Sequence, residues 1–271
     1  MADSAEQQGV MPSHSQVECA SLSDVGCIRE QNEDSVGYWV SPEQQDGKGV
    51  LAVVADGMGG YEGGQEASRL AVETVCQSYS AAESDPQAAL LAALQLAHDR
   101  IQEYARQHPE LLGMGTTCTA VSVTSGNLYF AHVGDSRLYL VRGSVISRLT
   151  RDHSYVNRLV ENGLIRPEDA ESHPQRHILI AALGVGTELV PDCPERPWTL
   201  QKDDTLVLCS DGLWGSVSDK EIQKAASSTS PDGACRKLVD LAKERGGPDN
   251  ITIQILRIAA DPVDPSTETV S

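Results

Sequence analysis

Four aspartates stand at the tips of short apolar runs of the type that forms strands. Asp56 follows LAVVA and Asp211 follows TLVLCS, while Asp135 follows YFAHVG and Asp249 directly precedes NITIQIL. A single Asp-Gly pair after a strand is ordinarily part of a turn. Four of them are different: if the strand tips share one end of a sheet sandwich, the carboxylates converge and repel one another unless cations lie among them.

The residue types favour hard divalent cations at such a site. Carboxylate oxygens suit Mg²⁺ or Mn²⁺ better than Zn²⁺, and the sequence has neither an H-E-x-x-H motif nor a C-x-x-C pair. Gly57 lacks a Cβ, so its backbone can approach an ion and offer a carbonyl oxygen. The run GMGGYEGG that begins there matches neither nucleotide-binding glycine pattern, because position 62 is Glu. Nucleotide binding is therefore disfavoured.

The overall charge restricts the partners. The 271 residues carry a formal net charge of -18, which repels nucleic acid and anionic membranes. The same field repels phosphorylated substrates, so an enzyme acting on them would need local positive charge from metal ions or an arginine.

The seven cysteines suggest neither a zinc site nor a disulfide framework, and no stretch resembles a signal core or a membrane span. We expect a cytoplasmic protein that binds no nucleic acid and does not span a membrane.

The apolar patterns predict an α+β fold with antiparallel sheets. Helical spacing covers three stretches, one of which places Ala67, Leu70, Ala71 and Val75 on one face. The expected strands are 49–57, 116–126, 128–136, 137–143, 204–212 and 250–258, and the expected helices are 65–79, 85–107 and 231–247. Turn residues predict one hairpin around Ser125-Gly126-Asn127 and another around Gly134-Asp135-Ser136. Strands and helices that gather in separate groups argue against an alternating, doubly wound sheet.

The chain reads as one domain between two tails. Residues 1–16 are polar and residues 259–271 carry two prolines, and both segments are predicted to be flexible. Between them we expect a single domain over residues 17–258, since no linker divides it and no internal repeat is present.

Eight segments in order resemble the successive motifs of the PPM (PP2C-type) phosphatases, most closely the compact bacterial members. One motif alone is weakly specific, but the ordered set covers roughly residues 20 to 258. The segments are VGCIREQNEDS, VVADGMGGYEGG, GMGTTCTAV, AHVGDSRLYLVR, LTRDHS, HILIAALG, LVLCSDGLW and GGPDNITI. The resemblance implies a four-layer α/β/β/α sandwich, two antiparallel β-sheets flanked by helices, with the metal site at one end.

The resemblance also implies roles for individual residues. Asp56 corresponds to the acid that bridges two metal ions, and the Gly57 carbonyl to a ligand of one of them. Asp211 and Asp249 correspond to ligands of the other ion. The two ions, Mn²⁺ or Mg²⁺, would activate a bridging hydroxide that attacks phosphorus in line.

Three further residues complete the implied site. Asp34 corresponds to an acid near the second ion, and Asp135 to a ligand of a third, weaker metal ion. Arg29 corresponds to the guanidinium that grips the substrate phosphate as a bidentate fork. Animal members carry His at the position of Met58 as a proton donor; Met cannot donate, so we hypothesise that a metal-bound water does so here.

The implied activity is hydrolysis of phosphoserine and phosphothreonine in proteins, by a monomer that opposes a cognate Ser/Thr kinase. The alternatives are a pseudophosphatase that binds phosphoproteins as a regulatory module and a hydrolase of small phosphoesters, because fold does not fix substrate. Erosion at a metal position would indicate the pseudophosphatase, but Asp56, Gly57, Asp211 and Asp249 all match, and so does Arg29.

Residues 151–182 lie where the family has a mobile flap beside the active site. The segment is polar and interrupted by Pro167 and Pro174. An ordinary solvated loop and a substrate-selecting flap are about equally supported. We interpret His153, His173 and His177 as structural or surface residues rather than catalytic ones.

Overall fold

The computed structural model describes residues 7–10, 17–41, 49–59, 62–170 and 173–259. One antiparallel sheet has the order β1 (Gln7–Val10), β2 (Val17–Asp24), β12 (Ile251–Ile258), β11 (Thr205–Cys209), β8 (Arg137–Arg142) and β9 (Val145–Arg148). The other has the order β10 (Trp198–Thr199), β7 (Asn127–Val133), β6 (Cys118–Thr124), β4 (Val50–Met58) and β3 (Asp34–Val40), and β5 (Gly115–Thr116) pairs with β4. The predicted strands are all present, whereas β2 and β3 were not anticipated.

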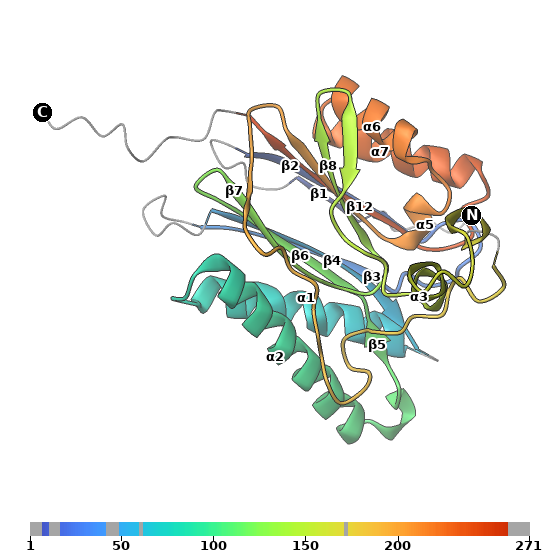
Figure 1. The fold of residues 1–271 in the computed structure, drawn as a ribbon. Helices are drawn as coiled ribbons and strands as arrows, with labels where there is room; N and C mark the ends of the chain where they lie inside the picture. Colours follow the sequence, from blue (N-terminus) through green and yellow to red (C-terminus); the bar gives the residue numbers. More distant parts are fainter. Residues whose placement is uncertain (1–6, 11–16, 42–48, 60–61, 171–172, 260–271) are drawn as a thin grey trace, which may run out of the picture.

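The sheets lie face to face between two layers of helices (Figure 1). α1 (Gly63–Ala81) and α2 (Pro86–Gln107) cover the β7–β6–β4–β3 sheet, and α6 (Asp219–Ser228) and α7 (Pro231–Glu244) cover the other. The shorter helices are η1 (Pro109–Leu111), α3 (Tyr155–Glu161), α4 (Pro167–Ala170) and α5 (Asp211–Trp214). The predicted four-layer α/β/β/α sandwich is confirmed.

Alternation along the central strands builds three apolar layers. In β4, Leu51 and Val53 pack toward α1 and α2, while Val50, Ala52 and Val54 pack against the opposite sheet. Because successive strand residues point to opposite faces, a strand covered on both sides must be apolar throughout. This explains why these runs are continuous in the sequence. The four α1 residues predicted to share a face are all buried.

Local signals also account for the helix starts. Asp85 caps α2, accepting hydrogen bonds from the backbone N–H groups of Gln87 and Ala88, with Pro86 in the first turn. Ser230 caps α7 in the same way through Gly233, and Pro231 follows it. The sequence therefore determines both helices locally as well as through their buried faces.

One predicted hairpin is confirmed and the other is wrong. β6 and β7 pair through Ser125 and Gly126, which both have positive φ as a two-residue turn requires. β7 and β8, however, belong to different sheets, so the chain crosses the sandwich at residues 134–136. Both strands are apolar and buried, and such runs do not specify which sheet they join.

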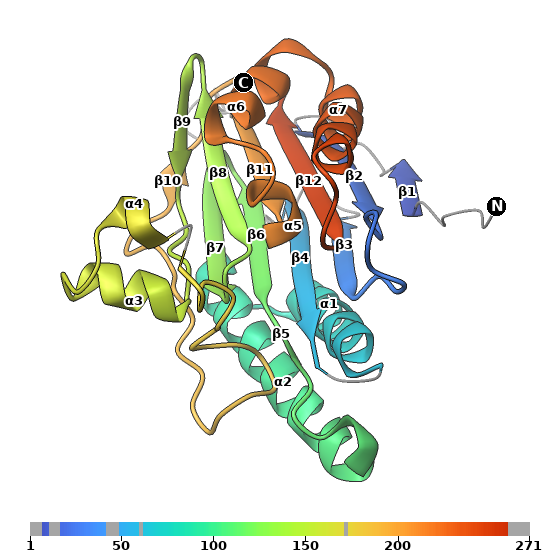
Figure 2. The ribbon, with the colours of Figure 1, turned by 90° about the vertical axis from the view of Figure 1, so that its right-hand side faces the viewer.

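Part of the predicted N-terminal tail and part of the flap segment form regular secondary structure. Residues 7–10, expected within a flexible tail, form β1 along the edge of β2, because backbone pairing at a sheet edge needs no apolar pattern. The remainder of 1–16, and 260–271, lie outside the described residues. The flap segment contains α3 and α4, and Figure 2 shows both beside the strand ends. In the part of the chain that the structure describes, no helix could cross a bilayer.

Candidate metal centre

The five predicted acids come from separate segments that end at the same side of the sandwich. Asp34 begins β3 and lies directly opposite Asp56 in the β3–β4 register. Asp211 follows β11 and Asp249 precedes β12, two strands that are paired along their length. Asp135 lies where the chain crosses from β7 to β8. Folding thus gathers acids that lie as far as 215 residues apart in sequence, and together we call them the acid cluster.

Their pKa values show that the carboxylates share one electrostatic field. Loss of water contact raises the pKa of Asp56 well above its ordinary value, and the charges of Asp34 and Asp211 raise it further. Desolvation also raises the pKa of Asp34 to about 7, opposed by hydrogen bonds to that carboxylate. One of these comes from Ser210 Oγ, 2.8 Å from Asp34 Oδ2, while Oδ1 is buried without a partner.

Asp211 and Asp135 belong to the same field. Desolvation and then the charge of Asp249 raise the pKa of Asp211, and the flap residue His177 acts in the opposite direction. Desolvation and then Asp211 raise the pKa of Asp135. His177 belongs to the flap segment and is exposed, and its effect on Asp211 places it close to the acid cluster.

Arg29 lies at the rim of the acid cluster. Its Nη2 donates to Asp249 Oδ2 at 2.9 Å, and its side chain is 49% exposed. A guanidinium has five N–H donors, so this bond leaves others available to an oxyanion. The structure therefore brings the predicted phosphate-gripping residue next to a predicted metal ligand.

The donor set fits divalent cations bound by oxygen. Buried carboxylates that raise one another's pKa values are stabilised by added positive charge, and Asp34 Oδ1 needs a partner. Over the described residues, no three Asp, Glu, His or Cys side chains are drawn together as a finished ligand cage. The acids thus surround a common site without already holding coordination geometry, and the ligand role of each, including the Gly57 carbonyl, stays a prediction.

The backbone around Asp56 is held from several sides. Thr116 Oγ1 and the Thr117 N–H donate to the Asp56 carbonyl at 2.9 and 2.8 Å, and the Asp56 N–H donates to Thr117 Oγ1 at 2.9 Å. Gly57 is required by close packing, because a Cβ there would collide with the carbonyl oxygens of Gly64 and Glu33. These contacts restrict where the Asp56 carboxylate can point.

Sequence reasoning missed three residues that position the acids. Ser210 bonds Asp34, and Trp214 Nε1 donates to the Asp135 carbonyl at 3.0 Å. Asn250 bonds the segment that carries Arg29. All three can form side-chain hydrogen bonds, and all three lie within three positions of Asp211 or Asp249 in the sequence. That proximity to a predicted acid was the available signal.

A second group of ionisable residues, buried or partly buried, lies near Asp135, and four of its five members pair with one another. Arg137 donates to both carboxylate oxygens of Asp152, at 3.1 and 2.7 Å, and stacks 3.6 Å above the Trp214 ring. His153 Nε2 lies 3.1 Å from Asp192 Oδ2. We call this group the paired cluster: His132, Arg137, Asp152, His153 and Asp192.

His132 is the most enclosed member of the paired cluster. Its Nε2 lies 3.1 Å from the carbonyl oxygens of Gly134 and Arg151, so this nitrogen donates, and Nδ1 accepts from the Thr119 hydroxyl. Burial lowers the pKa of His132 to about 4, with a further contribution from His153. The prediction that His153 is structural agrees with its burial.

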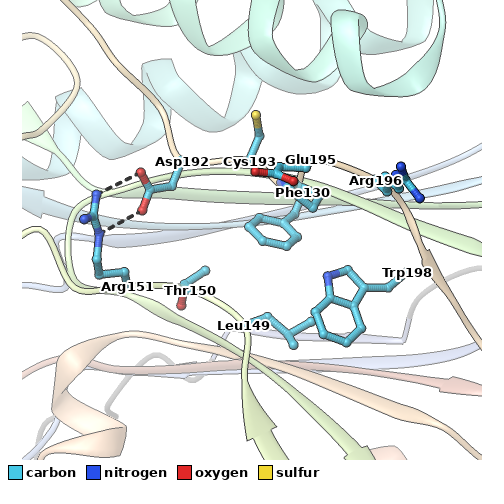
Figure 3. Close-up of a pocket in the computed structure, with 10 residues that line it drawn as sticks. Phe130, Leu149, Thr150, Arg151, Asp192, Cys193, Glu195, Arg196 and Trp198 are labelled. Carbon is cyan, nitrogen blue, oxygen red and sulfur yellow. Dashed lines mark hydrogen bonds and ion pairs between the residues drawn. The ribbon is translucent and has the colours of Figure 1, made fainter.

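A pocket of about 400 Å³ lies outside the acid cluster (Figure 3). Phe130 and Trp198 line it, and the Arg151–Asp192 ion pair stands on one side. None of the predicted site residues lines this pocket. The acid cluster is therefore recognised from its charges and not from the size of a cavity.

Comparison with protein families gives one model that matches residues 29–237, described as protein phosphatase 2C. A serine/threonine protein phosphatase PstP from Mycobacterium tuberculosis is 38% identical over 246 residues, which are 90% of this chain and 45% of that protein. A serine/threonine phosphatase stp from Listeria innocua is 35% identical over 86% of this chain and 93% of that protein. The chain thus spans less than half of the mycobacterial relative and nearly all of the listerial one.

Solved structures that resemble this chain are also serine/threonine phosphatases. The Streptococcus agalactiae serine/threonine phosphatase superposes with a TM-score of 0.82 at 33% identity, over 89% of this chain and 99% of that one. The catalytic domain of PstP, solved with two manganese ions, gives 0.79 at 33% identity over 90% and 99%.

Proposed function

The chain belongs to the protein phosphatase 2C family, and from this premise we propose that it hydrolyses phosphoserine and phosphothreonine in proteins. The observation that carries the proposal is the acid cluster with Arg29 at its rim. At one end of the sandwich, burial and the charges of neighbouring carboxylates, Asp249 among them, raise the pKa values of four acids from distant segments: Asp34, Asp56, Asp135 and Asp211. Such an arrangement costs stability, and cation-dependent chemistry explains why it is retained.

Two or three Mn²⁺ or Mg²⁺ ions held there would supply an activated water and neutralise charge on the phosphoryl oxygens. Asp34, Asp56, Asp211 and Asp249, with the Gly57 carbonyl, are the proposed ligands, and Asp135 is proposed for a third ion. Support comes from the shared field of these carboxylates and from the manganese-bound relative.

Arg29 is proposed to bind the substrate phosphate. Its guanidinium is half exposed beside Asp249, so its free N–H groups face solvent from which a phosphoprotein would approach. In a chain of net charge -18, this side chain and the cations provide the local attraction that a phosphate requires. Met58 offers no proton, so the proton for the leaving alkoxide is proposed to come from water.

The two rival functions are less well supported. A pseudophosphatase would need no cluster of mutually destabilising acids, and all predicted acids are present here. A small-molecule hydrolase would be expected to enclose its substrate in a deep pocket, whereas the pocket in Figure 3 is lined by none of the site residues. Arg29, half exposed at the rim of the acid cluster, suits a phosphate presented on a protein surface better.

The wider setting is also a proposal. A cognate Ser/Thr kinase would supply the phosphoprotein substrates. All seven cysteines are free, which suits the reducing cytoplasm. Exposed large apolar side chains such as Ile28, Leu112 and Leu164 come from separate segments, which favours a monomer.

The test is hydrolysis of a phosphothreonine peptide, an aryl phosphate and ATP, each with Mn²⁺, Mg²⁺ or chelator. We expect metal-dependent turnover of the peptide and its loss in Asp211→Asn. Asp203→Asn is the matched control, because Asp203 is exposed at the opposite end of β11. Activity that survives chelation, or full activity of Asp211→Asn, would remove the proposed site. Binding without hydrolysis would favour the pseudophosphatase, and preferential ATP hydrolysis the small-molecule enzyme.

A further inference from the structure

The side chain of Asn250 uses its whole amide to hold the segment that carries Arg29. Its Nδ2 donates to the carbonyl oxygens of Val25 and Gln31 at 3.0 and 2.9 Å. Its Oδ1 accepts from the Glu33 N–H at 2.8 Å. Asn250 is 5% exposed, so these bonds are shielded from water. One buried amide therefore joins both ends of the segment 25–33.

Little apolar packing fixes the course of this segment. It joins β2 to β3 outside any strand ladder, and every residue from 27 to 31 is exposed, including Ile28 at 70%. Apolar packing therefore does not determine where Arg29 lies. The Cys27 N–H donates to the Gly247 carbonyl at 2.8 Å, which adds one contact with the turn before Asp249. Polar contacts of the 247–250 turn thus hold the part that carries Arg29, while Asn32 Nδ2 donates to Ser23 Oγ and Ser68 Oγ donates to the Glu33 carbonyl near its end, at 2.8 and 2.6 Å.

Asn250 also connects the segment with two predicted metal ligands. Asp249 precedes it in the chain, and the Asn250 N–H donates to Asp249 Oδ1 at 2.9 Å. Glu33, bonded to Asn250 through its N–H, accepts from the Gly57 N–H at 3.1 Å through its carbonyl. A continuous set of hydrogen bonds therefore runs from the Asp249 turn through the Arg29 segment to Gly57.

We propose that Asn250 is a positioning residue that sets the place of Arg29 relative to Asp249 and thereby the binding of the substrate phosphate. This inference rests on the proposed phosphatase function. Asn250 touches neither the reacting atoms nor the phosphate; it acts through Arg29. Hydrogen-bonded phosphate recognition depends on geometry, so an Arg29 segment released by one to two ångströms would bind phosphate less well.

The experiment compares Asn250→Ala, Arg29→Ala and the double variant with wild type. We expect Asn250→Ala to lower kcat/KM on the phosphothreonine peptide roughly tenfold and to raise the inhibition constant of inorganic phosphate by a similar factor. Calorimetric affinity for Mn²⁺ should change by less than about twofold, since the ligands are retained. In the Arg29→Ala background, Asn250→Ala should cause no further loss, because positioning has an effect only when Arg29 is present.

Asn127→Ala is the matched control, because Asn127 bonds a carbonyl in the turn at the far end of β7. It should leave both constants unchanged. Should Asn250→Ala fail to fold, Asn250→Asp keeps the volume and the acceptor for Glu33 and removes only the two donors. Its added charge would repel phosphate with or without Arg29, whereas lost positioning disappears in the Arg29→Ala background.

Additive losses in the double variant, or an unchanged inhibition constant for phosphate in Asn250→Ala, would overturn the inference. Failure of the proposed function looks different: wild type would then show no metal-dependent turnover and Arg29→Ala no effect.

Discussion

The acid cluster and the paired cluster are neighbours in the fold but differ in how their charges are compensated. In the paired cluster, Arg137 and Asp152 neutralise each other, and His153 meets Asp192. In the acid cluster, Asp34 and Asp56 lie opposite each other on neighbouring strands; burial and then the charge of Asp34 raise the pKa of Asp56. Among the residues that the structure describes, Arg29, at the rim, is the one cation that bonds a carboxylate of the acid cluster.

The difference separates structural from functional charge. The charge of a buried ionisable group with a partner is compensated within the fold, whereas a set of like charges must be neutralised by bound cations or by uptake of protons. Asp135 shows the contrast within a few residues, because His132 and Arg137 on either side of it belong to the paired cluster. The two clusters should therefore respond oppositely to substitution and to pH.

The largest effect is expected from Asp56→Asn. Metal assistance contributes several kcal/mol, so removing the bridging acid should lower kcat/KM for the phosphothreonine peptide by roughly 10³-fold or more. Stability in chelator should be equal to or higher than that of wild type, because one repelling charge is gone. Urea denaturation measures the second quantity. A destabilised Asp56→Asn variant would show that the acid cluster helps to hold the fold.

Asp152→Asn should produce the reverse pattern. Breaking a buried ion pair by removing one partner leaves Arg137 without its bidentate carboxylate, which should cost about 3 kcal/mol of unfolding free energy. Activity of the folded fraction should fall far less than in Asp56→Asn. Asp232→Asn, which alters an exposed ion pair with Arg236, serves as the control and should cost less than about 1 kcal/mol. Equal losses of unfolding free energy in Asp152→Asn and Asp232→Asn would show that the Arg137–Asp152 pair does not stabilise the fold. The contrast between the two clusters would then not hold.

The smallest effect concerns pH and His132. Its pKa is about 4 in the folded protein, below the ordinary value of 6.5. The unfolded chain therefore binds a proton first as pH falls, so the stability that the neutral ring contributes is complete above pH 6.5 and is lost toward pH 4. At pH 5 the loss should be about 2 kcal/mol.

This contribution can be separated by comparing wild type with His132→Asn in chelator. The variant should be less stable at pH 7 but should lose about 2 kcal/mol less between pH 7 and pH 5. The raised pKa values of the acid cluster act in the opposite direction, since protonation relieves their repulsion, and they are common to both proteins. Parallel stability curves would indicate that His132 is not held neutral.

Much of this protein is determined locally by its sequence. The continuous apolar runs of β4, β6 and β11 specify strands covered on both faces. Asp85 with Pro86, and Ser230 with Pro231, specify where two helices begin. Acids at strand tips, and the order of the motifs, specify the chemistry of the candidate site, because those residue types and their neighbours are readable without coordinates.

Other features depended on contacts between distant segments. The sequence could not show that β7 and β8 join different sheets, because two buried apolar strands fit either one. Nor could it show that Ser210 bonds Asp34, or that Asn250 holds the Arg29 segment some 220 residues away in the chain. Spacing along a chain reports periodicity and caps, whereas the partner of a buried polar group is chosen only when the layers pack. The acids were therefore determined by the sequence, and their shared field and their supports by the tertiary structure.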